Sequence, residues 1–97
     1  MNIKDLQKLM KNGIIVTEHA RIRMFERKIS IVDIRKAIST GEVIETYKDR
    51  KPRPAYLIHG NNIHAVVSTD GKRLYYVTAY KPDDNYFEPD NKTRKKV

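Results

Sequence analysis

Four side chains in one short stretch combine an acid–base group with cations that bind phosphate: His19, Arg23, Glu26 and Arg27. Spacings of four place His19, Arg23 and Arg27 one above another on a helix. Guanidinium groups hold phosphate oxygens with paired hydrogen bonds, and an imidazole exchanges protons near neutral pH. The set therefore predicts a helix face that handles a phosphodiester. The alternative is a solvated face on which Glu26 pairs with a neighbouring arginine.

A second group of candidates lies in the predicted strands and comprises His59, His64, Tyr75, Tyr76 and Tyr80, with Lys81 at the strand end. If Asp70-Gly71 is a two-residue turn, His64 pairs with Val77 and lies on the opposite face from the Tyr80 ring. If the loop has three residues, His64 pairs with Tyr76 and shares a face with Tyr80. Only the second register assembles a His/Tyr site, and the sequence leaves both open. A third possibility is that His64 is a structural residue.

The first set requires a helix, which we expect from Glu18 to Lys28 with Thr17 as its N-cap. At about 100° per residue, its apolar positions form two strips, one of Ala20 and Met24 and the other of Ile22, Phe25 and Ile29. Two polar flanks of different composition remain. We expect one flank to face solvent and the other to face a cleft.

The remaining elements follow from periodicity and turn residues. We expect helices at 3–10 and from the Ser30 cap to Gly41, an extended link at 14–16, and strands at 42–47, 55–59, 63–68 and 73–80. A basic loop at 48–54 joins the first two strands. This order predicts an α+β domain at 1–82, with N-terminal helices packed on one face of a four-stranded antiparallel sheet and the other face open to a ligand. We expect a flexible charged tail at 83–97.

Composition narrows the class of protein. The 97 residues include 20 Lys and Arg against 12 Asp and Glu, a net charge of +8, and no Cys. Disulfides, thiol chemistry and Cys-ligated zinc are thereby excluded. The apolar runs are too short to cross a membrane, and charges near the N-terminus argue against a signal peptide, so we expect a cytoplasmic protein. The basic excess favours nucleic acid as the partner.

The three histidines show no spacing typical of a metal site, since no His-x-His or His-x-x-x-His pair occurs. The four glycines sit at predicted caps and turns and form no phosphate-binding loop. We therefore expect neither a metal ion nor a cofactor.

The segment from His19 to Ser30 reads His-Ala-x-x-Arg-Met-x-x-Arg-x-Ile-Ser, and Gly41-Glu42-Val43-Ile44 follows it. Together with the later blocks 63–67 and 77–82, this pattern resembles the family catalogued as domain of unknown function 4258. The resemblance covers about residues 14 to 84. That family is similar in layout to RelE/ParE-type toxins of the barnase–EndoU–colicin–RelE group and is often encoded beside a zinc-finger antitoxin.

The resemblance implies a RelE-like, metal-independent endoribonuclease that acts on mRNA as the toxin of a toxin–antitoxin pair. In such enzymes the 2′-hydroxyl of the substrate is the nucleophile, and the protein supplies acid, base and cationic groups. The matching positions make His19, His64 and Tyr80 the catalytic candidates and Arg23, Arg27 and Lys81 the RNA-phosphate ligands. The implied partners are RNA and a cognate antitoxin, of zinc-finger type in many relatives.

Two other interpretations remain. A non-catalytic toxin-like module would use the same basic face to bind a protein partner. A simple RNA- or DNA-binding domain would use it for nucleic acid, although no RNP-type aromatic motif is present.

Overall fold

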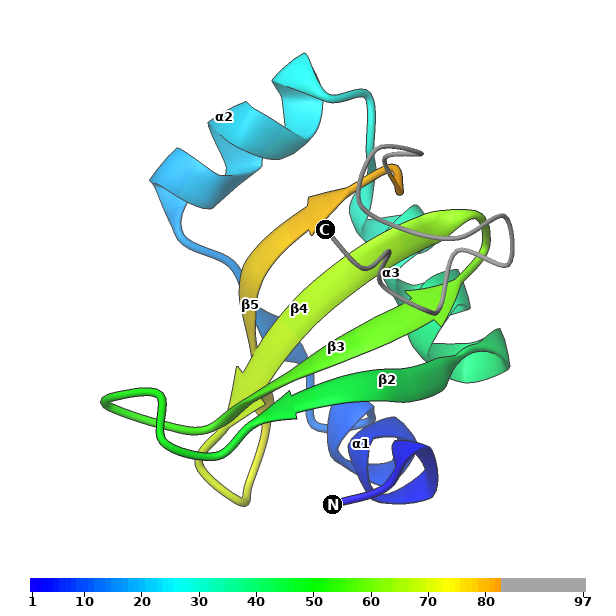
Figure 1. Ribbon diagram of the computed structural model, residues 1–97. Helices are drawn as coiled ribbons and strands as arrows, with labels where there is room; N and C mark the ends of the chain where they lie inside the picture. Colours follow the sequence, from blue (N-terminus) through cyan, green and yellow to red (C-terminus); the bar gives the residue numbers. More distant parts are fainter. Residues whose placement is uncertain (83–97) are drawn as a thin grey trace, which may run out of the picture.

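The computed structural model describes residues 1–82, which form three helices and five strands (Figure 1). Their order is α1 (Ile3–Met10), β1 (Ile14–Ile15), α2 (Glu18–Glu26), α3 (Ile31–Thr40), β2 (Glu42–Tyr47), β3 (Ala55–Gly60), β4 (Ile63–Thr69) and β5 (Leu74–Tyr80). The α+β class is confirmed. The predicted tail at 83–97 lies outside the described residues.

The helices begin at side chains that cap them. The Thr17 hydroxyl accepts a hydrogen bond from the backbone N–H of Ala20, at 3.1 Å. Ser30 and Asp33 form a reciprocal capping box, and the backbone N–H of Ser30 holds the pKa of the Asp33 carboxyl below its usual value. Both predicted caps are therefore confirmed.

Helix α2 ends at Glu26, whereas the sequence predicted that it continues to Lys28. Lys28 has φ 57°, a left-handed conformation that cannot continue an α-helix. This left-handed residue changes the direction of the chain, so the N–H of Ile29 bonds to the carbonyl of Met24 at 2.9 Å and the Ile29 side chain enters the core.

The sheet has five strands in the order β1-β5-β4-β3-β2, and β1 runs parallel to β5. The prediction of four antiparallel strands is wrong because Ile14 and Ile15 form a strand and not a free link. Two residues are too few to show a strand's alternation, and their partners, Leu74 and Tyr75, lie 60 residues further along the chain.

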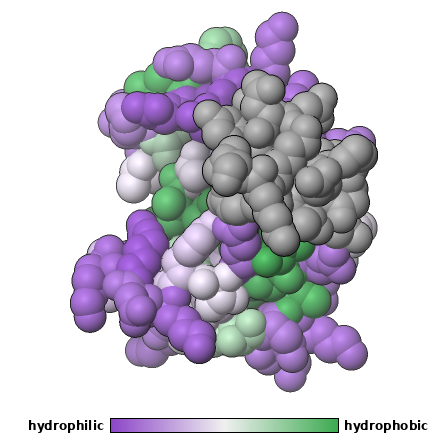
Figure 2. All heavy atoms as spheres, in the orientation of Figure 1, coloured by the Kyte–Doolittle hydropathy of each residue, from purple (hydrophilic) through white to green (hydrophobic). Residues whose placement is uncertain are grey.

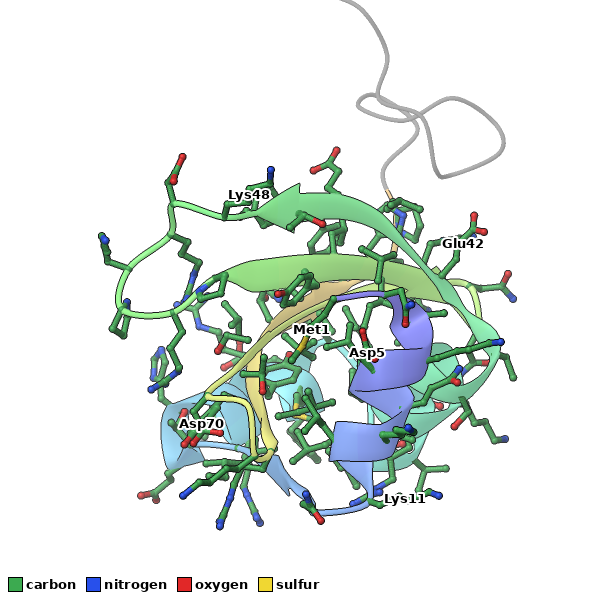
Figure 3. All side chains as sticks on the ribbon, turned by 90° about the horizontal axis from the view of Figure 1, so that it is seen from below. Met1, Asp5, Lys11, Glu42, Lys48 and Asp70 are labelled. Atoms are coloured by element: carbon green, nitrogen blue, oxygen red, sulfur yellow. The ribbon has the colours of Figure 1, made fainter. Side chains whose placement is uncertain are left out.

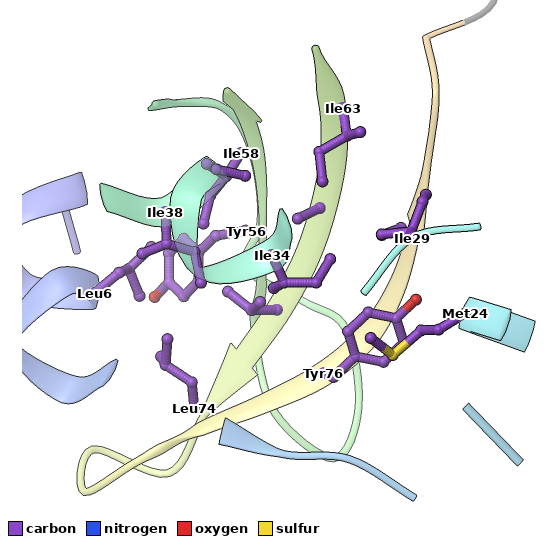
Figure 4. Close-up of a cluster of buried hydrophobic side chains, with 14 of the residues drawn as sticks. Leu6, Met24, Ile29, Ile34, Ile38, Tyr56, Ile58, Ile63, Leu74 and Tyr76 are labelled. Atoms are coloured by element: carbon purple, nitrogen blue, oxygen red, sulfur yellow. The ribbon is translucent and has the colours of Figure 1, made fainter. Parts of the chain in front are cut away.

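All three helices pack on one face of the sheet, and the main core fills the space between them (Figure 4). It includes Leu6, Ile34, Ile38, Ile58 and Leu74. Figure 3 shows α1, with Asp5, beneath the sheet, while Lys48 lies at the end of outer strand β2. The opposite face, here called the helix-free face, carries a smaller apolar cluster made only of strand residues.

Two hairpins align the side chains of the helix-free face. Asn61 and Asn62 both have positive φ and form a two-residue turn, which pairs His59 with His64. Between β4 and β5 the loop has four residues, Asp70–Arg73, and the register shifts by one residue beyond Val67. As a result His64 pairs with Tyr80.

Both registers considered from the sequence are therefore wrong, because His64 pairs with neither Val77 nor Tyr76. Each register assumed an Asp70-Gly71 loop of two or three residues and a regular strand after it. The four-residue loop and the bulge together move the partner of His64 to Tyr80. The shared face of His64 and Tyr80, which the three-residue loop predicted, is nevertheless present.

None of the helices within residues 1–82 combines the length and apolar content needed to span a bilayer. The predicted cytoplasmic location stays a prediction.

Helix α3 lies so close to β2 and β3 that two positions admit only glycine. A Cβ at Gly41 would lie 2.3 Å from the carbonyl oxygens of Ala37 and His59. A Cβ at Gly60 would lie 2.4 Å from the oxygen of Ala37 and 2.8 Å from the Cα of Gly41. Since backbone atoms cannot move aside individually, these glycines set the distance between α3 and the sheet.

We expect Gly60→Ala to destabilise the protein by about 1–3 kcal/mol, because the added methyl pushes α3 away from β3. Thermal unfolding followed by circular dichroism measures the effect. Arg35→Ala, on the exposed side of α3, is the control and should stay within about 0.5 kcal/mol of wild type. Equal melting temperatures for both variants would show that the close approach is not rigid.

Candidate functional site

Helix α2 rests on the edge of the sheet through one narrow strip. Ala20 and Met24 are buried, whereas Ile22 and Phe25, from the second apolar strip, are exposed. Arg27 fastens the end of the helix, since its Nη1 donates to the Thr78 hydroxyl at 2.9 Å and to the Ala79 carbonyl at 2.7 Å. Among the described strands β1 reaches only Leu74 and Tyr75, so no strand of residues 1–82 covers this part of the outer edge of β5.

The flank of α2 that carries His19 and Arg23 faces a cleft of about 290 Å³ beside β5. The cleft is lined by Thr17, His19, Ala20, Arg23, Tyr76, Val77 and Thr78. Arg23 Nε donates to His19 Nε2 at 3.2 Å, as the spacing of four predicted. In this arrangement Nε2 is the unprotonated ring nitrogen. Burial raises the pKa of the Tyr76 phenol, which keeps the floor of the cleft uncharged.

A row of three rings crosses the helix-free face on β3, β4 and β5. The rings of His59 and His64 lie edge-on with centroids 5.2 Å apart, and those of His64 and Tyr80 lie 5.5 Å apart. His64 is completely buried. Within the described residues, Nδ1 of His59 is buried without a hydrogen-bond partner. In residues 1–82 no group of three or more His, Cys, Asp or Glu side chains is arranged to hold a metal ion.

The other end of the same face has a fixed aromatic ring. Tyr75 donates its hydroxyl proton to Asp70 at 2.7 Å, and the Arg53 guanidinium carbon lies 4.0 Å from the Tyr75 ring centroid. The hydroxyl of Tyr75, with the backbone N–H groups of Lys72 and Arg73, lowers the pKa of Asp70 from 3.8 to about 2. The same hydrogen bond raises the pKa of the Tyr75 phenol. The Tyr75 ring is therefore held at its hydroxyl by Asp70 and over its face by Arg53.

The sequence-predicted residues fall into two groups. His19 and Arg23 lie together in the cleft, and His64 and Tyr80 lie together in the row of rings. The lining of the cleft includes neither His64 nor Tyr80. The groups are connected through β5, because Thr78 precedes Tyr80 by two residues and such residues share a face.

Arg27 and Lys81 have different surroundings. Arg27 bonds to β5 through Nη1, so at least part of its guanidinium serves the fold. Lys81 is exposed directly after β5. The solvated-face alternative expected Glu26 to pair with an arginine. Instead, within residues 1–82, Arg23 and Arg27 donate to His19 and β5 and no hydrogen bond joins them to Glu26.

Sequence reasoning missed three residues of this region: Thr78, Arg53 and Asp70. Thr78 is a β-branched residue in a strand and carries no signal of a polar role. Arg53 was assigned only to a basic loop, and its stacking on Tyr75 depends on how that loop folds back over the sheet. Asp70 was assigned to the turn, yet a five-residue separation from Tyr75 across a hairpin could have suggested their contact.

A scan against protein-family models matches residues 16–81 to the family described as Domain of unknown function (DUF4258). The match begins just before the α2 cap and ends just after β5, so it includes the cleft and the row of rings. No curated protein and no solved structure matches the chain.

We expect Arg27→Ala to lower the free energy of unfolding by about 1–2 kcal/mol, because hydrogen bonds from a charged donor to β5 are lost. Chemical unfolding followed by tyrosine fluorescence measures this. Thr78→Val removes one of the two acceptors and should cost less. A stability for Arg27→Ala equal to that of Arg35→Ala would show that the anchor contributes nothing.

We expect the Asp70 carboxyl to titrate at about 2 in the wild type and closer to its usual value in Tyr75→Phe, which removes the main hydrogen bond. NMR titration of the side-chain carboxyl carbon measures both. Because the folded pKa is depressed, this contact stabilises the fold above about pH 4, and the stabilisation disappears as the pH falls towards 2. An unchanged Asp70 pKa in the variant would contradict the assignment.

Proposed function

The chain belongs to the family described as Domain of unknown function (DUF4258), and we propose that it is a metal-independent endoribonuclease that acts on mRNA as the toxin of a toxin–antitoxin pair. The observation that carries the proposal is the His19–Arg23 pair in the cleft beside β5. The RelE-like layout and the cognate antitoxin are part of the same proposal and rest on the sequence resemblance.

His19 has the properties of a general base. Its Nε2 carries the one electron pair of the ring that accepts the hydrogen bond from Arg23, and this pair becomes available when Arg23 turns to a bound phosphate. The side chain is exposed, so a ribose hydroxyl can reach it. In the proposed reaction Nε2 takes the proton of the 2′-hydroxyl, the 2′-oxygen bonds to phosphorus, and the bond to the 5′-oxygen breaks.

Arg23 is suited to stabilise the phosphorane. Its Nε bonds to His19, and within the described residues its Nη1 and Nη2 have no hydrogen-bond partner. These two nitrogens present the paired donors that phosphate oxygens accept. A phosphate in the cleft would thus draw Arg23 away from His19 and lie between a base and a cation, and the negative charge of the transition state would be neutralised.

Tyr80 is the candidate for donating a proton to the leaving 5′-oxygen, and the buried His64 positions it through the contact between their rings. Tyr80 lies two residues beyond Thr78 on the same face of β5, and His64 lies opposite Tyr80 on β4. Exposed Lys81 follows Tyr80 and can contact the next phosphate. In this assignment the substrate crosses from the flank of α2 onto the helix-free face.

The surface charge supports an RNA path across this face. Residues 83–97 hold four acidic and four basic side chains, so the whole net charge of +8 lies in residues 1–82. Figure 2 shows hydrophilic side chains over α2 and over the β2–β3 loop, with paler and apolar atoms of the sheet between them. Arg53 and Tyr75 lie at the loop side of this surface. Phosphates on the two basic sides and bases over the uncharged middle are the arrangement that single-stranded RNA prefers.

We expect His19→Ala to slow cleavage of a labelled single-stranded RNA by about 10²- to 10⁴-fold, because the general base is removed. Arg23→Ala should also slow it, and Arg35→Ala should cleave like wild type. Denaturing gels measure the rates, in EDTA for RNA alone and in a magnesium buffer for RNA on ribosomes. All three variants exchange exposed side chains, and circular dichroism checks their folding.

Two outcomes would reject the enzyme. If wild-type protein binds the RNA and leaves it intact with and without ribosomes, the non-catalytic module is the correct interpretation. If His19→Ala cleaves as fast as wild type, the cleft is not the active site.

A further inference from the structure

A second hollow lies on the other flank of α2, away from the cleft. This hollow, here called the apolar groove, has a volume of about 810 Å³ and is lined mainly by Ile14, Val16, Met24, Phe25, Ile29 and Ile31. It runs beneath α2 between β1 and the start of α3. It shares no lining residue with the His19–Arg23 cleft.

Phe25 at the rim of the groove is the most exposed large apolar side chain of the described residues, with 86% of its surface accessible. Ile22, one turn earlier on α2, is 53% exposed. The core takes Ala20 and Met24 from this helix and Ile29 from beyond its end, so the exposed Ile22 and Phe25 of the second apolar strip contribute little to it. An unused phenylalanine beside an apolar hollow is typical of an interaction surface.

The charged residues of the groove indicate the kind of partner. Arg21 and Lys28 are its two basic lining residues, and Glu26 is its one acidic lining residue. Arg21 lies within α2, and Lys28 lies just beyond the end of the helix at Glu26. Apart from these three charged residues and Ser30, the lining is apolar. A segment that fills the groove therefore needs apolar side chains facing α2 and acidic side chains beside them.

Two other occupants fit less well. A second copy of the chain would bring two basic surfaces and two net charges of +8 together. RNA offers no apolar surface that matches the isoleucine, methionine and phenylalanine lining, and only Arg21 and Lys28 at this groove are cations that could bind its phosphates.

We propose that the apolar groove binds an acidic amphipathic α-helix of another protein, with Phe25 as the central anchor and Arg21 and Lys28 as charge contacts. Such a helix packs its i, i+3, i+4 and i+7 side chains into a groove of this kind. Because groove and cleft lie on opposite flanks of α2, the partner holds the helix without covering His19 or Arg23. The proposed helix binding does not depend on whether the protein is a ribonuclease.

The test uses the full chain labelled with ¹⁵N and two synthetic peptides of about four helical turns. One peptide has leucine on one face and glutamate and glutamine on the other, and its twin has lysine in place of each glutamate. We expect the acidic peptide to shift the amide signals of residues 25–31 and to bind at least tenfold more tightly than its twin. Phe25→Asp should weaken binding at least tenfold and leave the melting temperature unchanged, since the side chain is exposed.

A charge reversal makes the test specific. The double variant Arg21→Glu, Lys28→Glu should prefer the lysine peptide, while Arg35→Glu should keep the wild-type preference. Equal affinity for both peptides, no binding, or shifts confined to the cleft and the helix-free face would overturn the proposal. A wild-type dimer in sedimentation that Phe25→Asp dissociates would assign the groove to a second copy and overturn it as well.

Discussion

The way α2 is attached to β5 determines everything else about this surface. Two buried side chains, Ala20 and Met24, and one arginine, Arg27, hold a nine-residue helix on a strand edge. Because the attachment is so narrow, both flanks of the helix remain accessible. One flank carries His19 and Arg23 above the cleft, and the other carries Phe25 beside the apolar groove.

The sheet provides the second part of the surface. All three helices lie on one face, so the other face presents strand side chains in cross-strand rows. The two-residue Asn turn aligns His59 with His64, and the bulge in β5 aligns His64 with Tyr80. At the opposite end the Asp70–Tyr75 bond and the stacked Arg53 fix a ring. The helix-free face thus has polar or aromatic groups at both ends and an apolar middle.

Features that depend on neighbouring residues could be predicted from the sequence. The caps of Thr17 and Ser30, the strip of Ala20 and Met24, and the His19–Arg23 contact all follow from spacings of three or four. Features that depend on distant residues could not. Strand β1 exists only because β5 accepts it, and the His64–Tyr80 pairing depends on a four-residue loop and a bulge that the composition of the turn does not indicate. The exposure of Phe25 also depends on the tertiary fold, since the helical wheel shows two apolar strips without showing which one the core uses.

The chemical structure of RNA ends after incubation with the purified chain tests the proposed activity most directly. Mass spectrometry of the fragments formed from a single-stranded RNA in EDTA distinguishes the possible reactions. Attack by the 2′-hydroxyl with His19 as base predicts fragments that end in a 2′,3′-cyclic phosphate, or the 3′-phosphate formed from it, and that begin with a 5′-hydroxyl. RNA that stays intact both alone and on ribosomes, or fragments with a 3′-hydroxyl and a 5′-phosphate, would contradict the account.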